Sequence, residues 1–164
     1  MKNKTKTLVM NAMIAALYVA LTVLVKPFAS GAIQFRISEA LNHIVVFNKK
    51  LMWGVVLGVV IFNALFSTGL DVVFGGVQTL ISLWLMAKLR PKIKNDAVAM
   101  LVNTLIFSVS MIFIAVMLTI VGGSFTISGF LSLYGTLALS EFIIMLISAP
   151  VMYLLNKAIH FERY

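Results

Sequence analysis

The feature that most constrains this chain is a series of apolar runs, several of them as long as a helix that crosses a lipid bilayer. Such a helix needs about 20 mostly apolar residues. Apolar residues make up 62% of the 164 residues and charged residues 11%, whereas about a quarter of a soluble domain is charged. The sequence therefore predicts an all-α integral membrane protein with a single transmembrane domain over residues 1–164.

Polar and turn-forming stretches divide the apolar sequence into six segments. We expect a loop through about residue 36 after the first segment. Lys26-Pro27 ends that first segment, because proline removes a backbone donor and restricts the residue before it. A second loop, rich in Gly, Ser and Thr, is expected at 121–134. The sequence thus predicts a bundle of six transmembrane helices over residues 8–25, 37–48, 51–67, 76–87, 97–120 and 135–156.

The distribution of positive charge predicts the orientation of these spans. Cytoplasmic loops retain Lys and Arg. With six spans and an internal N-terminus, only Lys26 and Arg36 of the 13 basic residues lie outside. We therefore expect both termini in the cytoplasm of a bacterial cell, in a multi-pass protein of the cell membrane. The net charge of +8 then reflects topology, and we expect no binding to nucleic acid.

Small residues recur four apart on two of the expected helices. Gly54 and Gly58 lie on one, and we expect them to pack inside the bundle. Ala12, Ala16 and Ala20 lie on the first helix. Such ladders let two helices approach closely in lipid. The alanines therefore fit either packing inside the bundle or docking onto another membrane subunit.

Polar side chains at membrane depth are costly and so indicate function. Glu39 and Glu141 are the acids within expected helices, and at a rise of about 1.5 Å per residue Glu141 lies about 9 Å below the outer end of its span. We expect an outward-facing cavity, covered by the loops 26–36 and 121–134, that binds a small polar molecule. Its candidate lining residues are Gln34, Arg36, Glu39, His43, Asn63, Asp71, Gln78 and Glu141.

Some of these residues also have a purely structural interpretation. Arg36 and Glu39 are three apart, so they could neutralise each other on one helical face. His43 resembles a histidine whose hydrogen bonds are satisfied in the core. Asn103 lies near the inner end of its span, where a helix-helix hydrogen bond is the expected role.

Several function classes lack the residues they require. The chain has no cysteine and no Gly-rich loop ending in Gly-Lys-Ser/Thr that would cradle a nucleotide. His43 and His160 form no metal-ligand spacing, and no nucleophile accompanies a histidine. We therefore expect no enzyme, no bound metal and no cofactor in this chain. A binding subunit fits better, and any energy comes from a partner.

The stretch Ile33-Gln34-Phe35-Arg36-Ile37-Ser38-Glu39-Ala40-Leu41 resembles the signature of the QueT family, the substrate-binding (S) components of energy-coupling factor (ECF) transporters. The alanine ladder, the six spans and the cytoplasmic termini match as well. The resemblance implies a deazaguanine substrate: aminomethyl- or cyano-deazaguanine, or queuine. It also implies an ECF module of one transmembrane coupling subunit and two ATPases that use ATP, with Ala12, Ala16 and Ala20 as the docking surface.

The expected cavity suits such a ligand. One carboxylate can accept the two adjacent N–H donors of a guanine edge, and Phe35, Phe74, Phe125 or Tyr134 could stack on the flat ring. Two alternatives stay open. The chain could be the S component for another vitamin-like molecule such as riboflavin or thiamin, or it could be a stand-alone secondary carrier or channel. A structural membrane adaptor is a third and weaker alternative, because Glu39 and Glu141 would lie at depth without a ligand.

Overall fold

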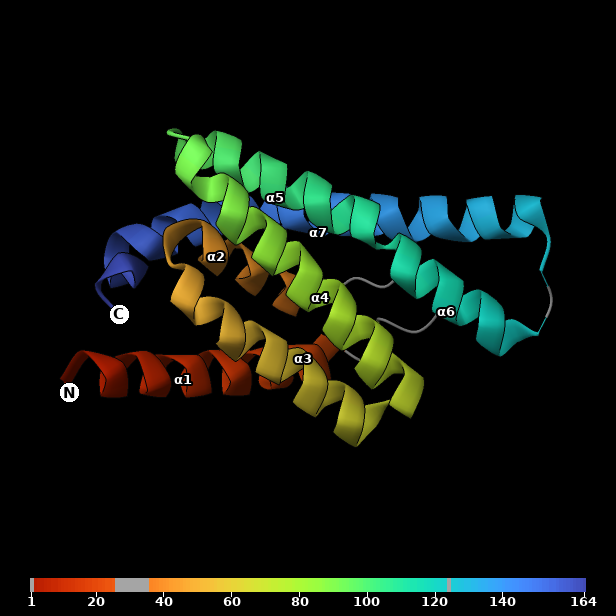
Figure 1. The fold of residues 1–164 in the computed structure, drawn as a ribbon, viewed down its shortest axis with the longest axis horizontal. Helices are drawn as coiled ribbons and strands as arrows, with labels where there is room; N and C mark the ends of the chain where they lie inside the picture. Colours follow the sequence, from red (N-terminus) through yellow and green to blue (C-terminus); the bar gives the residue numbers. More distant parts are fainter. Residues whose placement is uncertain (1, 26–35, 124) are drawn as a thin grey trace.

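A computed structural model describes residues 2–25, 36–123 and 125–164, and in these residues the chain is helical, without a strand (Figure 1). The all-α prediction is confirmed for this part of the chain. The long helices are α1 (Lys2–Val25), α3 (Met52–Phe66), α4 (Gly69–Leu89), α5 (Asp96–Ser110), α6 (Ile112–Gly122) and α7 (Ile127–Ile159). Shorter pieces are η2 (Ile37–His43), α2 (Ile44–Phe47), η3 (Lys49–Leu51), η4 (Arg90–Lys92) and η5 (Phe161–Arg163).

Five helical stretches in the described residues are long and apolar enough to cross a membrane, with α5 and α6 joining into one of them. The second predicted helix, at 37–48, is present as η2 and α2 over Ile37–Phe47, but it is shorter than the five candidate spans. Most side chains of this short segment are buried against other helices, its polar residues Ser38, Glu39, Asn42 and His43 included. It is therefore an internal segment rather than a lipid-facing one, and the count of six full-length spans is not confirmed.

The predicted loop at 121–134 and the stretch between the third and fourth predicted helices, residues 68–75, are both largely helical. The last helix begins at Ile127, eight residues before the predicted start, because Thr126 accepts a hydrogen bond from the Gly129 amide and caps it. The helix α4 begins at Gly69, before the predicted start at residue 76, with Thr68 and Asp71 forming a capping box. Gly, Ser and Thr near these starts indicated a loop, but here they begin helices.

Most of the basic residues gather at one end of the bundle. The N-terminus and the C-terminus lie at this end together (Figure 1). Asn48 Nδ2 donates to the carbonyl oxygens of Phe161 (2.9 Å) and Tyr164 (2.8 Å), and Arg90 Nε donates to that of Val46 (2.7 Å). The loops around 49 and 90 and the C-terminal residues therefore share this end, which we call the basic end. That it faces the cytoplasm stays a prediction.

The two small-residue ladders have different roles. A Cβ on Gly54 would lie 2.6 Å from the Asn11 carbonyl oxygen, and one on Gly58 would lie 2.6 Å from Tyr18 Cβ. These glycines therefore pack α3 closely on α1 inside the bundle, as predicted. The alanines of the other ladder, Ala12, Ala16 and Ala20, are all exposed on α1.

Candidate functional site

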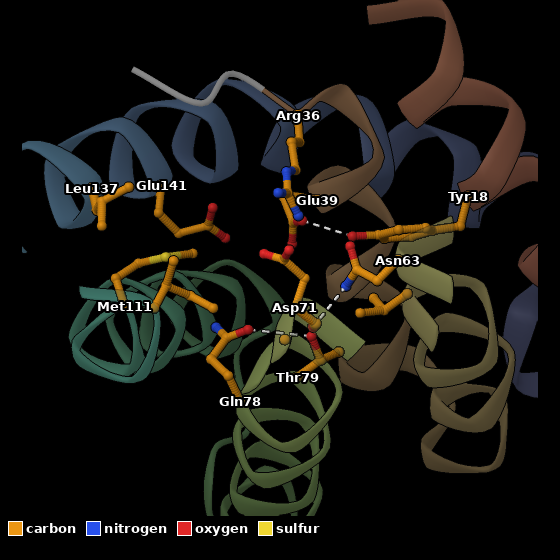
Figure 2. A pocket seen from close by; sticks show the side chains of 13 residues that line it. Tyr18, Arg36, Glu39, Asn63, Asp71, Gln78, Thr79, Met111, Leu137 and Glu141 are labelled. Atoms are coloured by element: carbon orange, nitrogen blue, oxygen red, sulfur yellow. Dashed lines mark hydrogen bonds between the residues drawn. The ribbon is translucent and has the colours of Figure 1, made fainter. Parts of the chain in front are cut away.

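Polar residues from several helices meet in a small cavity toward the end of the bundle opposite the basic end. Asn63, in the last turn of α3, and Asp71, in the first turn of α4, mark its position along the bundle. Figure 2 shows Glu141 of α7 pointing into the space that Arg36, Glu39 and Asp71 also face. The lining residues are Tyr18, Arg36, Glu39, Val59, Asn63, Asp71, Gly75, Gln78, Thr79, Met111, Ile114, Leu137 and Glu141.

The structure brings most of the predicted site residues to this one cavity: Arg36, Glu39, Asn63, Asp71, Gln78 and Glu141. Gln34 lies outside the described residues. His43 does not line the cavity. Its Nε2 is 3.0 Å from the Met145 carbonyl oxygen and its Nδ1 is 3.4 Å from Asn103 Nδ2, so it has the structural role that the sequence also allowed.

Glu39 is buried and bonded on both carboxylate oxygens. Its Oε1 accepts a hydrogen bond from the Tyr18 hydroxyl (2.7 Å), and its Oε2 accepts one from Asn42 Nδ2 (2.6 Å). Asn103 Nδ2 in turn donates to the Asn42 carbonyl oxygen (3.1 Å). Glu39 therefore joins α1, the short segment and, through Asn42, α5, and its oxygens already have partners within the protein.

Glu141 differs from Glu39 in this respect. Its side chain is only 3% exposed, yet its Oε1 has no hydrogen-bond partner. Asn63 repeats the pattern across the cavity, because its Nδ2 donates to the Asp71 carbonyl oxygen (3.1 Å) while its Oδ1 has no partner. A buried polar atom without a partner is costly. Two such acceptors in one cavity suit a ligand that brings N–H donors.

The remaining polar groups are held by local contacts. Asp71 Oδ2 accepts hydrogen bonds from Ser67 Oγ (2.6 Å), Thr68 Oγ1 (2.7 Å) and the Thr68 amide (3.0 Å), so it caps α4 as well as lining the cavity. Gln78 Nε2 donates to Ser110 Oγ (2.7 Å), and its Oε1 accepts from Thr79 Oγ1 (3.2 Å). These bonds fix the cavity wall between α4 and α5.

Arg36 supplies positive charge to the cavity. It directly precedes η2, where its carbonyl oxygen accepts a hydrogen bond from the Glu39 amide (2.9 Å). Figure 2 shows its side chain extending toward Glu39 and Asp71. The cavity thus combines one guanidinium with three carboxylates, an arrangement that can recognise a small molecule carrying both donors and a carbonyl acceptor.

Sequence reasoning missed Tyr18, Thr79 and the apolar lining residues, among them Met111 and Leu137. Tyr18 could have been found from the sequence, because a tyrosine hydroxyl deep in an apolar run needs a hydrogen-bond partner. Among the described residues that line the cavity, Tyr18 is the only aromatic one. Phe74, Phe125 and Tyr134, expected as stacking partners, do not line it, and Phe35 lies outside the described residues.

The cavity volume is about 40 Å³, whereas small-molecule sites usually enclose roughly 300–1,000 Å³. This is space for about one or two water molecules. A bicyclic ligand therefore requires the helices around the cavity to move apart or their side chains to change rotamer.

Comparison with known proteins matches nearly the whole chain to one family. The family described as QueT transporter matches residues 8–157. The chain belongs to the QueT transporter family. A QueT relative named queuosine precursor transporter QueT, from Lactococcus lactis subsp. cremoris (strain MG1363), is 39% identical over 171 residues, covering 99% of each chain. No solved structure matches the chain. Membership in this family makes the chain a member of a family of transporters.

Proposed function

We propose that this chain is the S component of an ECF-type transporter and that its cavity binds a queuosine precursor. The candidate ligands are aminomethyl- or cyano-deazaguanine, or queuine. Family membership supports a transporter, and the name of the relative from Lactococcus lactis supports the substrate class. The structural observation that supports it best is the unpartnered acceptor of Glu141, with that of Asn63 in the same cavity.

The chemistry of a guanine edge complements these acceptors. A ring N–H and an exocyclic amine lie side by side on that edge, so one carboxylate can accept both. Glu141 offers the free oxygen for this contact, and Asn63 Oδ1 offers a second acceptor. The Arg36 guanidinium suits the ring carbonyl. Glu39, bonded to Tyr18 and Asn42, has the role of shaping the wall.

The exposed alanines support the proposed partners. Ala12, Ala16 and Ala20 form a smooth strip on the outer side of α1, against which a helix of a coupling subunit can pack closely. Two ATPases in the same module would supply the energy. In this proposal the chain lies in the bacterial cell membrane with the basic end in the cytoplasm.

Reconstituted transport tests this role. Proteoliposomes with the chain and its ECF module should take up labelled cyano-deazaguanine when ATP is present on the ATPase side. Proteoliposomes with the chain alone, or with an ATPase variant that cannot hydrolyse ATP, should not. Uptake by the chain alone that depends on an ion gradient would show a secondary carrier, and ATP-driven uptake of riboflavin or thiamin but not of deazaguanines would show a different substrate.

A further inference from the structure

A second polar site lies far from the cavity, in a groove of about 290 Å³ between α3 and α4 at the basic end. Three lysines line it, Lys49 and Lys50 from η3 and Lys88 from the last turn of α4. Trp53 and Trp84 also line it and are 59% and 54% exposed, while Met52 beside them is buried. The groove thus combines a cationic rim with two exposed indoles.

None of the residues that line this groove is acidic. All five acidic side chains of the sequence lie in the described part of the chain. Glu39, Asp71 and Glu141 line the cavity, Asp96 pairs with Arg90, and Glu162 lies 3.8 Å from His160. Glu162 and the C-terminal residue, Tyr164, border a neighbouring groove, which Lys49 and Lys50 border as well. The groove therefore has a cationic rim and no carboxylate in its own lining, which suits an anion from outside the chain.

The surroundings of the groove indicate what brings this charge. Tryptophans favour the headgroup level of a bilayer, and Lys88 Nζ lies 5.6 Å from the centre of the Trp84 ring. Beyond Trp53 and Trp84, the same helical faces continue with exposed Leu57, Ile81 and Val77 at spacings of three and four residues. A cationic rim followed by apolar helix faces matches a headgroup followed by acyl chains.

We infer that this groove binds an anionic phospholipid, with the phosphodiester among Lys49, Lys50 and Lys88 and the acyl chains along α3 and α4. Lysine is a good phosphate ligand as a point charge, and basic residues near a membrane surface attract anionic lipid. The inference does not depend on the substrate of the cavity or on the ECF module.

Tryptophan fluorescence tests it directly, because the sequence has two tryptophans and both line the groove. The purified chain is placed in nanodiscs of neutral phosphatidylcholine, and lipid with brominated acyl chains, which quench indole, is added in increasing fraction. Brominated phosphatidylglycerol should reach half-maximal quenching at a mole fraction several-fold lower than brominated phosphatidylcholine. Equal quenching by the two lipids would overturn the inference.

Variants separate the site from the overall charge. The triple variant Lys49→Gln, Lys50→Gln, Lys88→Gln should lose the preference for phosphatidylglycerol. The matched control Lys92→Gln, Lys94→Gln, Lys157→Gln removes the same charge from exposed positions and should keep it. The single variant Lys88→Gln, with one lysine changed, should show a smaller preference than the parent. An equal loss in both triple variants would show an effect of net charge alone and contradict a site.

A competition experiment distinguishes a bound lipid from a bound water-soluble phosphate compound. Glycerophosphoglycerol and inorganic phosphate carry the same phosphate chemistry without acyl chains. At millimolar concentration neither should relieve the quenching by brominated phosphatidylglycerol. Displacement of the lipid by either compound would assign the groove to a water-soluble phosphate ligand and overturn the lipid assignment.

Discussion

The Tyr18 hydroxyl donates a hydrogen bond of 2.7 Å to Oε1 of Glu39. Tyr18 belongs to α1, whose outer side presents the alanine ladder, and Glu39 forms part of the cavity wall. One contact therefore links the cavity to the helix proposed to dock on a coupling subunit. Gly58 keeps this arrangement close, because a Cβ there would meet Tyr18 Cβ at 2.6 Å.

We expect Tyr18→Phe to destabilise the protein. The substitution leaves one oxygen of a buried carboxyl group without its donor, at a cost of about 1–3 kcal/mol. Thermal unfolding of the purified chain in one detergent should show a lower Tm than that of the parent. Tyr153→Phe, at a more exposed position of α7, is the control and should unfold like the parent. An unchanged Tm for Tyr18→Phe would show that this contact does not stabilise the fold.

The two buried glutamates should differ in their effect on ligand binding. Glu141→Gln replaces an accepting oxygen by a donor that would face the donors of the ligand, so we expect deazaguanine affinity to fall at least tenfold, or about 1.4 kcal/mol. Glu39→Gln should act mainly on stability, because the oxygens of Glu39 are bonded to Tyr18 and Asn42. Glu162→Gln, at the basic end, is the control.

Isothermal calorimetry and thermal unfolding of these variants distinguish the two roles. A larger loss of affinity in a well-folded Glu39→Gln variant than in Glu141→Gln would exchange the roles assigned to the two carboxyl groups.

Much of this arrangement could be predicted from the sequence. The parts that could not be predicted were missed for physical reasons. Arg36, Glu39, Asn63, Asp71, Gln78 and Glu141 meet in one cavity because helical rise sets the depth of a polar residue in its span. Which carboxyl group keeps a free oxygen depends on contacts between distant segments, such as Tyr18 with Glu39. The bounds of the short second segment were close to the prediction, 37–48 against Ile37–Phe47, but its packing inside the bundle depends on contacts that the sequence does not show.

Bulk on the alanine ladder should prevent docking. Ala16→Leu adds three carbon atoms at an exposed position of α1 where close helix packing is proposed. We expect loss of transport and of co-purification with the ECF module, while ligand binding by the isolated chain stays near the parental value. Ala97→Leu, exposed on α5, serves as control. Intact assembly with lost ligand binding would instead place these alanines in the packing of the binding domain.

Single introduced cysteines test the orientation, because the sequence contains none. Lys92 and Phe125 are both exposed, at the basic end and between α6 and α7 respectively. A membrane-impermeant maleimide added to intact cells should label Phe125→Cys and leave Lys92→Cys unmodified until the cells are permeabilised. Labelling of Lys92→Cys in sealed cells would reverse the predicted topology.

Direct binding of ligand to the purified chain tests the central claim, that the cavity around Glu141 holds a deazaguanine. Calorimetry in detergent compares cyano-deazaguanine, aminomethyl-deazaguanine and queuine with riboflavin and thiamin, for the parent and for Glu141→Gln. We predict saturable binding of at least one deazaguanine by the parent, at least tenfold weaker binding by Glu141→Gln, and no binding of the two vitamins. Parental affinity for every deazaguanine in a folded Glu141→Gln variant, or no binding of any deazaguanine by the parent, would contradict it.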